Sequence, residues 1–186
     1  LIHRWRWIVH EDIEGNPVII GGHVVDNKIA STDKKILEIL TNDARIPITT
    51  LARQVNSTPA IVRNKVKALE NKGIILRYRI DIDLNKLDLE FYKAIIYCKY
   101  LNKRRENSLL EYMRQHPKAI YYVRSLAPWE IEIEFIVESH SEFTSIITEL
   151  RDKFHDIIKN YEFVVISWDA WLPGFYEIVP TSDAKR

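Results

Sequence analysis

The feature that most restricts the fold of this chain is a change in the spacing of its apolar residues. Between residues 31 and 71 these residues recur every three or four positions, which is the spacing of amphipathic helices. Between residues 91 and 168 two further helical runs lie among four runs that alternate or are rich in β-branched and aromatic residues. A chain of 186 residues is long enough for two compact domains. The sequence therefore predicts an α+β protein in which a three-helix domain precedes a mixed one.

The first predicted domain covers residues 31–82 and begins with two helices. Ser31 or Thr32 is expected to cap the first helix, because a hydroxyl there can accept a hydrogen bond from the first turn. The apolar face of this helix is formed by Ile36, Ile39, Leu40 and Ala44. A second, shorter helix is predicted over residues 49–55.

The third helix has the clearest end signals. Thr58 is a good N-cap, Pro59 suits the first helical position, and the helical pattern continues to Asn71. Gly73 stands where a left-handed residue commonly ends a helix. Residues 74–82 then alternate like a strand. The first domain is therefore predicted to consist of three helices followed by a strand.

The second predicted domain covers residues 91–168, after a linker at 83–90. Its strands are expected at 91–100, 119–126, 130–137 and 161–168, and its helices at 104–115 and 141–154. The resulting order, βαββαβ, is the ferredoxin-like motif. Residues 1–30 predict an N-terminal extension with a β-hairpin, and residues 169–186 a C-terminal tail. The chain starts with Leu1 rather than Met, as expected of a piece of a longer protein.

Charge is distributed unevenly along the chain. Residues 31–82 hold ten Lys/Arg and five Asp/Glu, whereas residues 83–186 hold fourteen against seventeen and residues 1–30 three against four. The segments therefore carry +5, −3 and −1, which sum to the +1 of the whole chain. A basic segment beside an acidic one indicates that only the first domain meets a polyanion.

The third helix has one face suited to reading DNA. On a helical wheel Val62, Val66 and Leu69 share the buried side. Small, amide and basic side chains on the exposed side are those that can enter a major groove, and base edges meet the N-terminal half of such a helix. The base-reading candidates are Ala60, Ile61, Arg63, Asn64 and Lys67, and the phosphate-contacting candidates on flanking elements are Arg45, Arg53, Arg77 and Arg79. The alternative is the solvated face of an ordinary amphipathic helix.

Several runs with intact spacing resemble the Lrp/AsnC family of regulators. They are Asp33-Lys34-Lys35-Ile36-Leu37 through Arg45-Ile46, Leu51-Ala52-Arg53-Gln54-Val55, Thr58-Pro59-Ala60-Ile61-Val62-Arg63-Asn64-Lys65-Val66, and Leu69-Glu70-Asn71-Lys72-Gly73-Ile74-Ile75. The resemblance implies a winged helix-turn-helix that binds double-stranded DNA with residues 60–67 in the groove. It also implies a homodimer or a higher oligomer. One departure is the pair Asn64-Lys65, where the family usually has a more basic pair.

The second domain resembles the family's amino-acid-responsive, oligomer-forming domain more loosely. The family commonly has Gly, an aromatic residue or His, and Asp between the two central strands, near an effector site between subunits. This chain has Ala127, Trp129 and Glu130 there. These three residues are the candidates for binding a small-molecule effector such as an amino acid. Another ligand, or none, remains an alternative.

The strand at 130–137 has an acidic face and an apolar face. Glu130, Glu132 and Glu134 alternate with apolar residues, so the carboxylates project from one side of the strand. This side is expected to be solvated, and the alternatives are a subunit contact or an amine site. No metal site is expected, because no loop of suitable ligand spacing accompanies the carboxylates.

No catalytic residue or cofactor is expected. The six histidines form no metal-binding motif, and the sequence has no phosphate-binding glycine motif. Cys98, the single cysteine, lies in a strand pattern and fits a reducing, cytoplasmic setting. No run is long and apolar enough for a membrane span. The alternatives to a specific regulator are a tetrapyrrole-binding protein resembling sirohaem decarboxylases and a DNA-wrapping architectural protein of low specificity.

Overall fold

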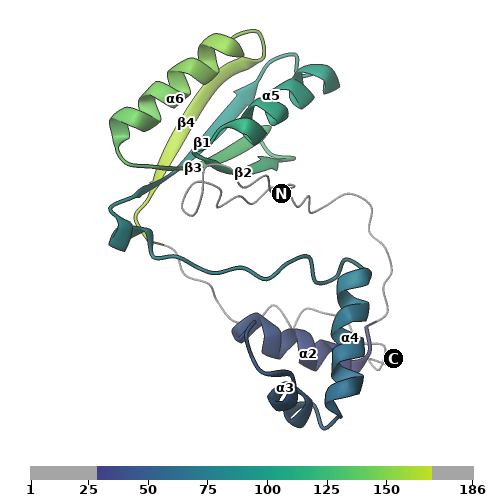
Figure 1. Cartoon of the computed structure of the whole chain (residues 1–186). Coiled ribbons are helices and arrows are strands. Elements are labelled where there is room, and N and C mark those ends of the chain that lie inside the picture. Colours follow the sequence, from purple (N-terminus) through teal and green to yellow (C-terminus); the bar gives the residue numbers. More distant parts are fainter. Residues whose placement is uncertain (1–28, 169–186) are drawn as a thin grey trace. The chain divides into compact units, whose positions relative to one another are not determined.

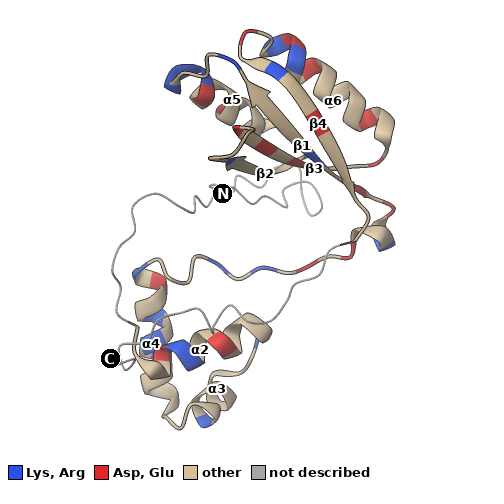
Figure 2. Cartoon of the chain, turned by 180° about the vertical axis from the view of Figure 1, so that it is seen from behind, with Lys and Arg blue, Asp and Glu red and all other residues tan. Residues whose placement is uncertain are grey.

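The computed structural model describes residues 29–168, which form two compact units, 29–81 and 82–168. Both units are seen in Figure 1, and from behind in Figure 2. The hairpin predicted within residues 1–30 lies outside the described residues, apart from residues 29 and 30, and so does the tail predicted at 169–186.

Three helices build the first unit, as predicted. They are α2 (Ser31–Asn42), α3 (Ile48–Gln54) and α4 (Pro59–Asn71). Their apolar faces meet in a core of buried residues, which are Ile36, Leu51, Ala52, Val55, Val62 and Leu69. Because each helix is too short to be stable alone, this shared core is what holds the three together.

The ends of α4 follow the sequence signals, whereas those of α2 do not. The Thr58 hydroxyl accepts a hydrogen bond from the backbone N–H of Ile61 at 3.4 Å, and Gly73 has φ +66°. In α2 the N-cap position falls on Ala30, with no side-chain cap, so the predicted cap at Ser31 or Thr32 is wrong. The helix ends at Asn42, so Ala44 lies outside it and is exposed. The prediction that Ala44 belongs to the apolar face of this helix is therefore wrong.

The strand predicted at residues 74–82 does not form. Residues 76–83 have no regular secondary structure, although Leu76, Tyr78 and Ile80 alternate as expected. These three side chains are 46%, 48% and 56% exposed. A strand needs the backbone of a partner, and within residues 29–168 no segment pairs with this one. Alternation alone therefore does not make a strand here.

The second unit has the predicted βαββαβ order. After the 3₁₀ helix η1 (Leu84–Leu87) come β1 (Glu90–Cys98), α5 (Lys103–Gln115), β2 (Ala119–Arg124), β3 (Ile131–Val137), α6 (His140–Lys153) and β4 (Ile158–Ile166). The sheet order is β2-β3-β1-β4, and every neighbouring pair is antiparallel. This is the ferredoxin-like arrangement.

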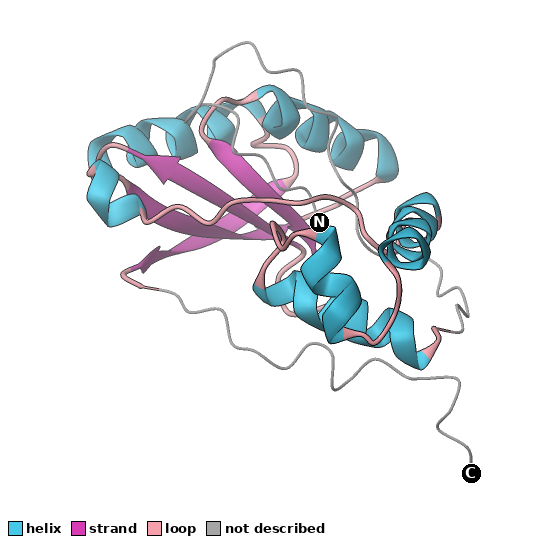
Figure 3. Ribbon diagram, turned by 60° about the horizontal axis from the view of Figure 1, so that its bottom comes forward, coloured by secondary structure: helices cyan, strands magenta, loops and turns pink. Residues whose placement is uncertain are grey.

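Both helices of the second unit cover one face of its sheet, as Figure 3 shows. Ile131, Ile133 and Phe135 of β3 are fully buried on that side, and the Phe135 ring meets Phe143 of α6 edge to face with ring centroids 5.9 Å apart. The period-2 pattern of the strand thus selects which residues join the core. In the described part of the chain, no helix has the length and apolarity that crossing a membrane requires.

Candidate nucleic-acid interface

A tight turn fixes the direction of α4 relative to α3. Asn56 adopts φ +51°, a left-handed conformation that Asn tolerates better than most residues. The backbone N–H of Ser57 donates to the Ala52 carbonyl at 2.9 Å, which closes the turn. Val62 and Leu69, 0% and 3% exposed, then anchor α4 in the core. The opposite side of α4 is therefore presented to solvent.

All five predicted base-reading residues lie on the exposed part of α4. Ala60, Ile61, Arg63, Asn64 and Lys67 are each exposed. Ile61 is 49% exposed although it is apolar, at the N-terminal end of the helix. An exposed apolar side chain beside amide and basic ones matches the chemistry of base edges, which offer both hydrogen-bonding groups and the thymine methyl.

The four predicted phosphate-contacting arginines are also exposed: Arg45, Arg53, Arg77 and Arg79. Arg53 lies in the last turn of α3, and Arg77 and Arg79 follow Gly73. Partial burial and the charge of Arg79 lower the pKa of Arg77 from its usual value. Arg79 also forms a 3.5 Å ion pair with Asp81.

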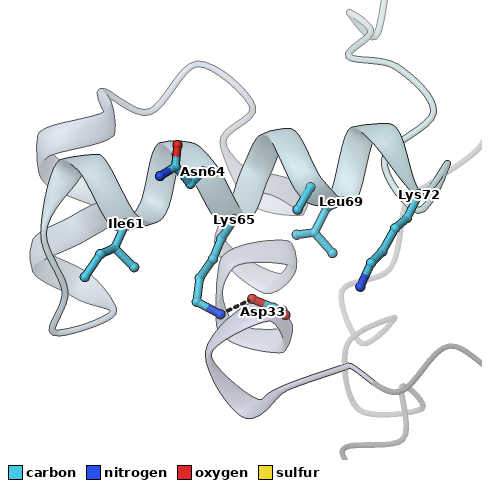
Figure 4. Close-up of a pocket in the computed structure, with 7 residues that line it drawn as sticks. Asp33, Ile61, Asn64, Lys65, Leu69 and Lys72 are labelled. Carbon is cyan, nitrogen blue, oxygen red and sulfur yellow. Dashed lines mark hydrogen bonds and ion pairs between the residues drawn. The ribbon is translucent and has the colours of Figure 1, made fainter.

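Lys65 has a role that the sequence pattern did not reveal. Its Nζ lies 2.6 Å from the Asp33 carboxylate of α2, and the two side chains are 31% and 20% exposed. An open groove of about 320 Å³ runs along this side of α4, bounded also by Ile61, Asn64 and Leu69 (Figure 4). On a helical wheel Lys65 stands about 60° from Val62, close to the buried stripe. That position was the available sign that Lys65 faces α2.

The arrangement matches known proteins in both units. A family model described as winged helix-turn-helix DNA-binding matches residues 29–75. The HTH-type transcriptional regulator LrpA of Pyrococcus horikoshii is 51% identical over 59 residues, which cover 32% of this chain and 42% of that protein. Regulatory protein AsnC of Haemophilus influenzae is 24% identical over 132 residues, which cover 71% of this chain and 80% of that protein. The first unit is thus similar to the DNA-binding part of regulators of the Lrp/AsnC type.

The fold of the chain also agrees with solved structures. The crystal structure of a transcriptional regulator from Neisseria meningitidis in complex with L-Met has a TM-score of 0.68. It covers 78% of this chain and 94% of its own, at 16% identity, so the likeness concerns the fold alone. In sequence, the chain spans about two fifths of the length of the curated relatives it matches first.

Two of the candidate effector residues in the β2–β3 loop are engaged within the unit. The Glu130 carboxylate accepts a hydrogen bond from the Cys98 backbone N–H at 2.7 Å. The Trp129 indole N–H donates to Glu132 at 2.8 Å. Ala127 is exposed at the tip of the loop. Glu130 therefore ties the loop to the end of β1, in addition to any contact with a ligand.

The acidic face of β3 is paired with a lysine of the same sheet. Lys93 Nζ lies 3.2 Å from Glu132 and 3.1 Å from Glu134. Burial acts to raise the pKa of Glu132, but hydrogen bonds from Trp129 and Lys93 outweigh it and lower the pKa. Two of the three carboxylates thus share one lysine, which offsets one of their two negative charges, and this face is not a plain acidic surface.

Cys98 has the properties of a packing residue. It is half-buried beside the core of the second unit, and burial together with the nearby Glu130 charge raises the pKa of its thiol to about 11. A thiol with so high a pKa is almost fully protonated at neutral pH and is a poor nucleophile.

Proposed function

We propose that the chain is a cytoplasmic, sequence-specific DNA-binding transcription regulator. The observation that carries this proposal is the exposed face of α4, where Arg63 and Asn64 stand beside the apolar Ile61 on a helix anchored by Val62 and Leu69. The groove-entering helix of a helix-turn-helix needs such a polar outer face on a rigid support. The names of the relatives, which are transcription regulators, support the same reading.

In this proposal one group of residues contacts the base edges and a second group contacts the phosphates. Arg63 and Asn64 can form paired hydrogen bonds to guanine and adenine, and Ala60, Ile61 and Lys67 complete the contact. The arginines at 45, 53, 77 and 79 contact phosphates and set the register of the helix without sequence preference. Arg63 and Asn64 then each contribute about 1–3 kcal/mol on the preferred site.

The proposal includes assembly into a homodimer or a higher oligomer. Val164 of β4 is 43% exposed and pairs with Lys93 on the sheet face away from the helices. Phe91 and Ile166 form the pair two positions along on the same face and are also apolar and partly exposed, and an apolar patch of this kind supports a contact with a second subunit. A symmetric dimer has two α4 helices and is expected to bind a pseudo-palindromic site.

Control by a small-molecule effector, such as an amino acid, is the last part of the proposal. The Neisseria meningitidis regulator, solved with L-Met, supports this chemistry. The candidate positions are Ala127, Trp129 and Glu130. Because Glu130 and Trp129 already make bonds within the unit, a ligand there would have to exchange with them or bind beside them. Thermal-shift titration with the twenty amino acids tests this part directly.

The central test is selection of genomic DNA fragments by the whole chain at two salt concentrations, followed by sequencing. Enrichment of one pseudo-palindromic motif is expected, with an affinity that falls steeply as salt rises. Arg63→Ala should lose about 1–3 kcal/mol on that motif, whereas Arg77→Ala should weaken all sequences alike and flatten the salt dependence.

Other results of the selection have clear meanings. Binding without an enriched motif would favour the DNA-wrapping architectural alternative, which differs in its specificity ratio. Absence of DNA binding at low salt would refute the regulator proposal and make tetrapyrrole binding the next assay. Normal motif binding by Arg63→Ala would show that α4 is not the reading helix.

A further inference from the structure

One end of the second unit concentrates positive charge although the unit as a whole is acidic. Residues 99–105 and 151–159 hold seven Lys/Arg and two Asp, a local net charge of +5. The two segments touch, because the Lys99 N–H donates to the Ile157 carbonyl at 2.7 Å and Arg105 bonds Asp156. Figure 2 shows these blue segments at the start of α5 and the end of α6. The distal basic surface consists of Lys99, Lys103, Arg104, Arg151, Lys153, His155 and Lys159, all exposed.

The cations at the start of α5 do not stabilise that helix. Lys103 and Arg104 occupy its first turn, where the helix dipole is positive and acidic residues are favoured. Arg105, the third cation of this turn, is neutralised by Asp156. Within the described residues no ion pair is found for Lys103 or Arg104. Their charges oppose the helix and face solvent, as expected of side chains that bind an anion.

An exposed tyrosine lies among these cations in an unfavourable backbone conformation. Tyr100 has φ +54° and is 92% exposed, directly after Lys99. The left-handed conformation costs a non-glycine residue about 1–2 kcal/mol, and this tyrosine recovers none of it by burial. Tyrosine hydroxyls are among the groups that donate hydrogen bonds to phosphates. Its position in the chain, between Lys99 and Lys103, therefore fits a phosphate-binding edge.

The other half of the surface contains a polar hollow. An open depression of about 350 Å³ is bounded by Arg151, His155, Lys159 and Asn160, among others. The Arg151 guanidinium lies over the Tyr161 ring, 5.5 Å from its centroid, which holds it at the rim. Arg151 alone would be explained by its place in the last turn of α6, where cations favour the helix dipole. Lys159 lies in β4, outside the helix, and needs a different explanation.

We propose that the distal basic surface binds the phosphate backbone of duplex DNA outside the site read by α4. This inference rests on the proposed function and extends the DNA footprint to the second unit. The average charge of residues 83–186 conceals the surface, because acids elsewhere in the unit outnumber its cations. Contacts made by lysine, arginine and tyrosine alone carry no sequence preference, so they would add affinity for long DNA without changing the motif.

The test compares matched charge reversals in the whole chain. Arg104→Glu removes a cation from the distal basic surface and places an acid where the helix dipole favours it, so its thermal midpoint should be unchanged or higher. Lys86→Glu, in η1, is the control, because Lys86 is exposed and lies outside the surface. Binding is measured on a duplex of the motif alone and on one with flanking DNA, at several salt concentrations.

The wild type and Lys86→Glu should bind the longer duplex more tightly than the short one. Arg104→Glu should lose this advantage, keep its affinity for the short duplex, and lower the slope of log K against log salt by about one. An unchanged advantage and slope in Arg104→Glu would overturn the proposal. So would a wild-type chain that gains nothing from the flanks.

The two proposals fail in different ways. If no motif is enriched, the proposed regulator function fails, and random-sequence duplexes still decide whether Arg104→Glu lowers the salt slope. If Arg63→Ala loses the motif while the flank advantage remains, both proposals are supported. If only single-stranded RNA binding depends on Arg104, the surface serves another polyanion and the duplex DNA proposal is overturned.

Discussion

Replacing Lys65 should separate the stability of the first unit from DNA binding. The Lys65 ammonium lies 2.6 Å from Asp33, and this contact joins α4 to α2. The neighbouring Lys67 is fully on the exposed side of the same helix. We therefore expect Lys65→Met to weaken the unit and leave DNA affinity intact, whereas Lys67→Ala should do the reverse. Methionine is chosen because it keeps most of the aliphatic chain.

The size of the effect follows from the exposure of the pair. Fully exposed ion pairs contribute about 0.2–1 kcal/mol, and hydrogen bonds to charged groups up to about 1.5–3 kcal/mol when shielded from water. Side chains that are 31% and 20% exposed lie between these cases. We expect a coupling free energy of about 1 kcal/mol in a double-mutant cycle of Lys65→Met and Asp33→Asn.

Hydrogen exchange of the α2 and α4 amides is the suitable assay, because two units need not unfold together. The Lys67→Ala control should leave exchange unchanged within about 0.5 kcal/mol. A coupling below about 0.3 kcal/mol, which is near the additivity error of such cycles, would refute the role given to this pair. So would a loss of DNA affinity in Lys65→Met as large as that in Lys67→Ala.

Three further predictions concern stability. Burial lowers the pKa of His116, so stability should be complete above about pH 6.5 and fall as the pH drops through the lowered folded value; His116→Asn should flatten this dependence in thermal melts. Trp129→Phe removes the donor to Glu132, whose pKa is lowered in the fold, so urea titrations should show a smaller loss of stability between about pH 5 and pH 3 than the wild type. Gly73 has φ +66° and open space around its Cβ position, so Gly73→Ala should cost about 1–2 kcal/mol from backbone strain alone, and Gly73→Asn clearly less, by calorimetry. Equal calorimetric midpoints for the wild type and Gly73→Ala would contradict the prediction for Gly73.

The candidate DNA-reading face could be predicted from the sequence because its signals are local. Thr58 and Gly73 mark the ends of α4 by bonds and conformations that involve only neighbouring residues. Val62 and Leu69 mark its buried side by helical spacing. A side chain's position on a helix is fixed by the helix itself, so the exposure of Arg63 and Asn64 follows without knowledge of other elements.

Contacts between residues that are far apart in the sequence could not be predicted from such local signals. The strand expected at 74–82 failed to form because alternation does not specify a backbone partner. The partner of Lys65 lies 32 residues away, and Glu130 accepts its hydrogen bond from a backbone N–H in β1, also 32 residues away. Such contacts are set by the packing of whole elements.

The order of the helices, the end signals of α4 and the chemistry of its outer face were determined by the sequence alone, because each depends on residues within one or two helical turns. The tertiary structure decided which charges meet. Residues 99–105 and 151–159 lie far apart in the sequence, and the antiparallel pairing of β1 with β4 brings them to one end of the sheet. The electrostatic potential at a surface depends on how close charges lie in space and not on their spacing in the sequence. A chain whose net charge is nearly zero can therefore carry a strongly basic surface.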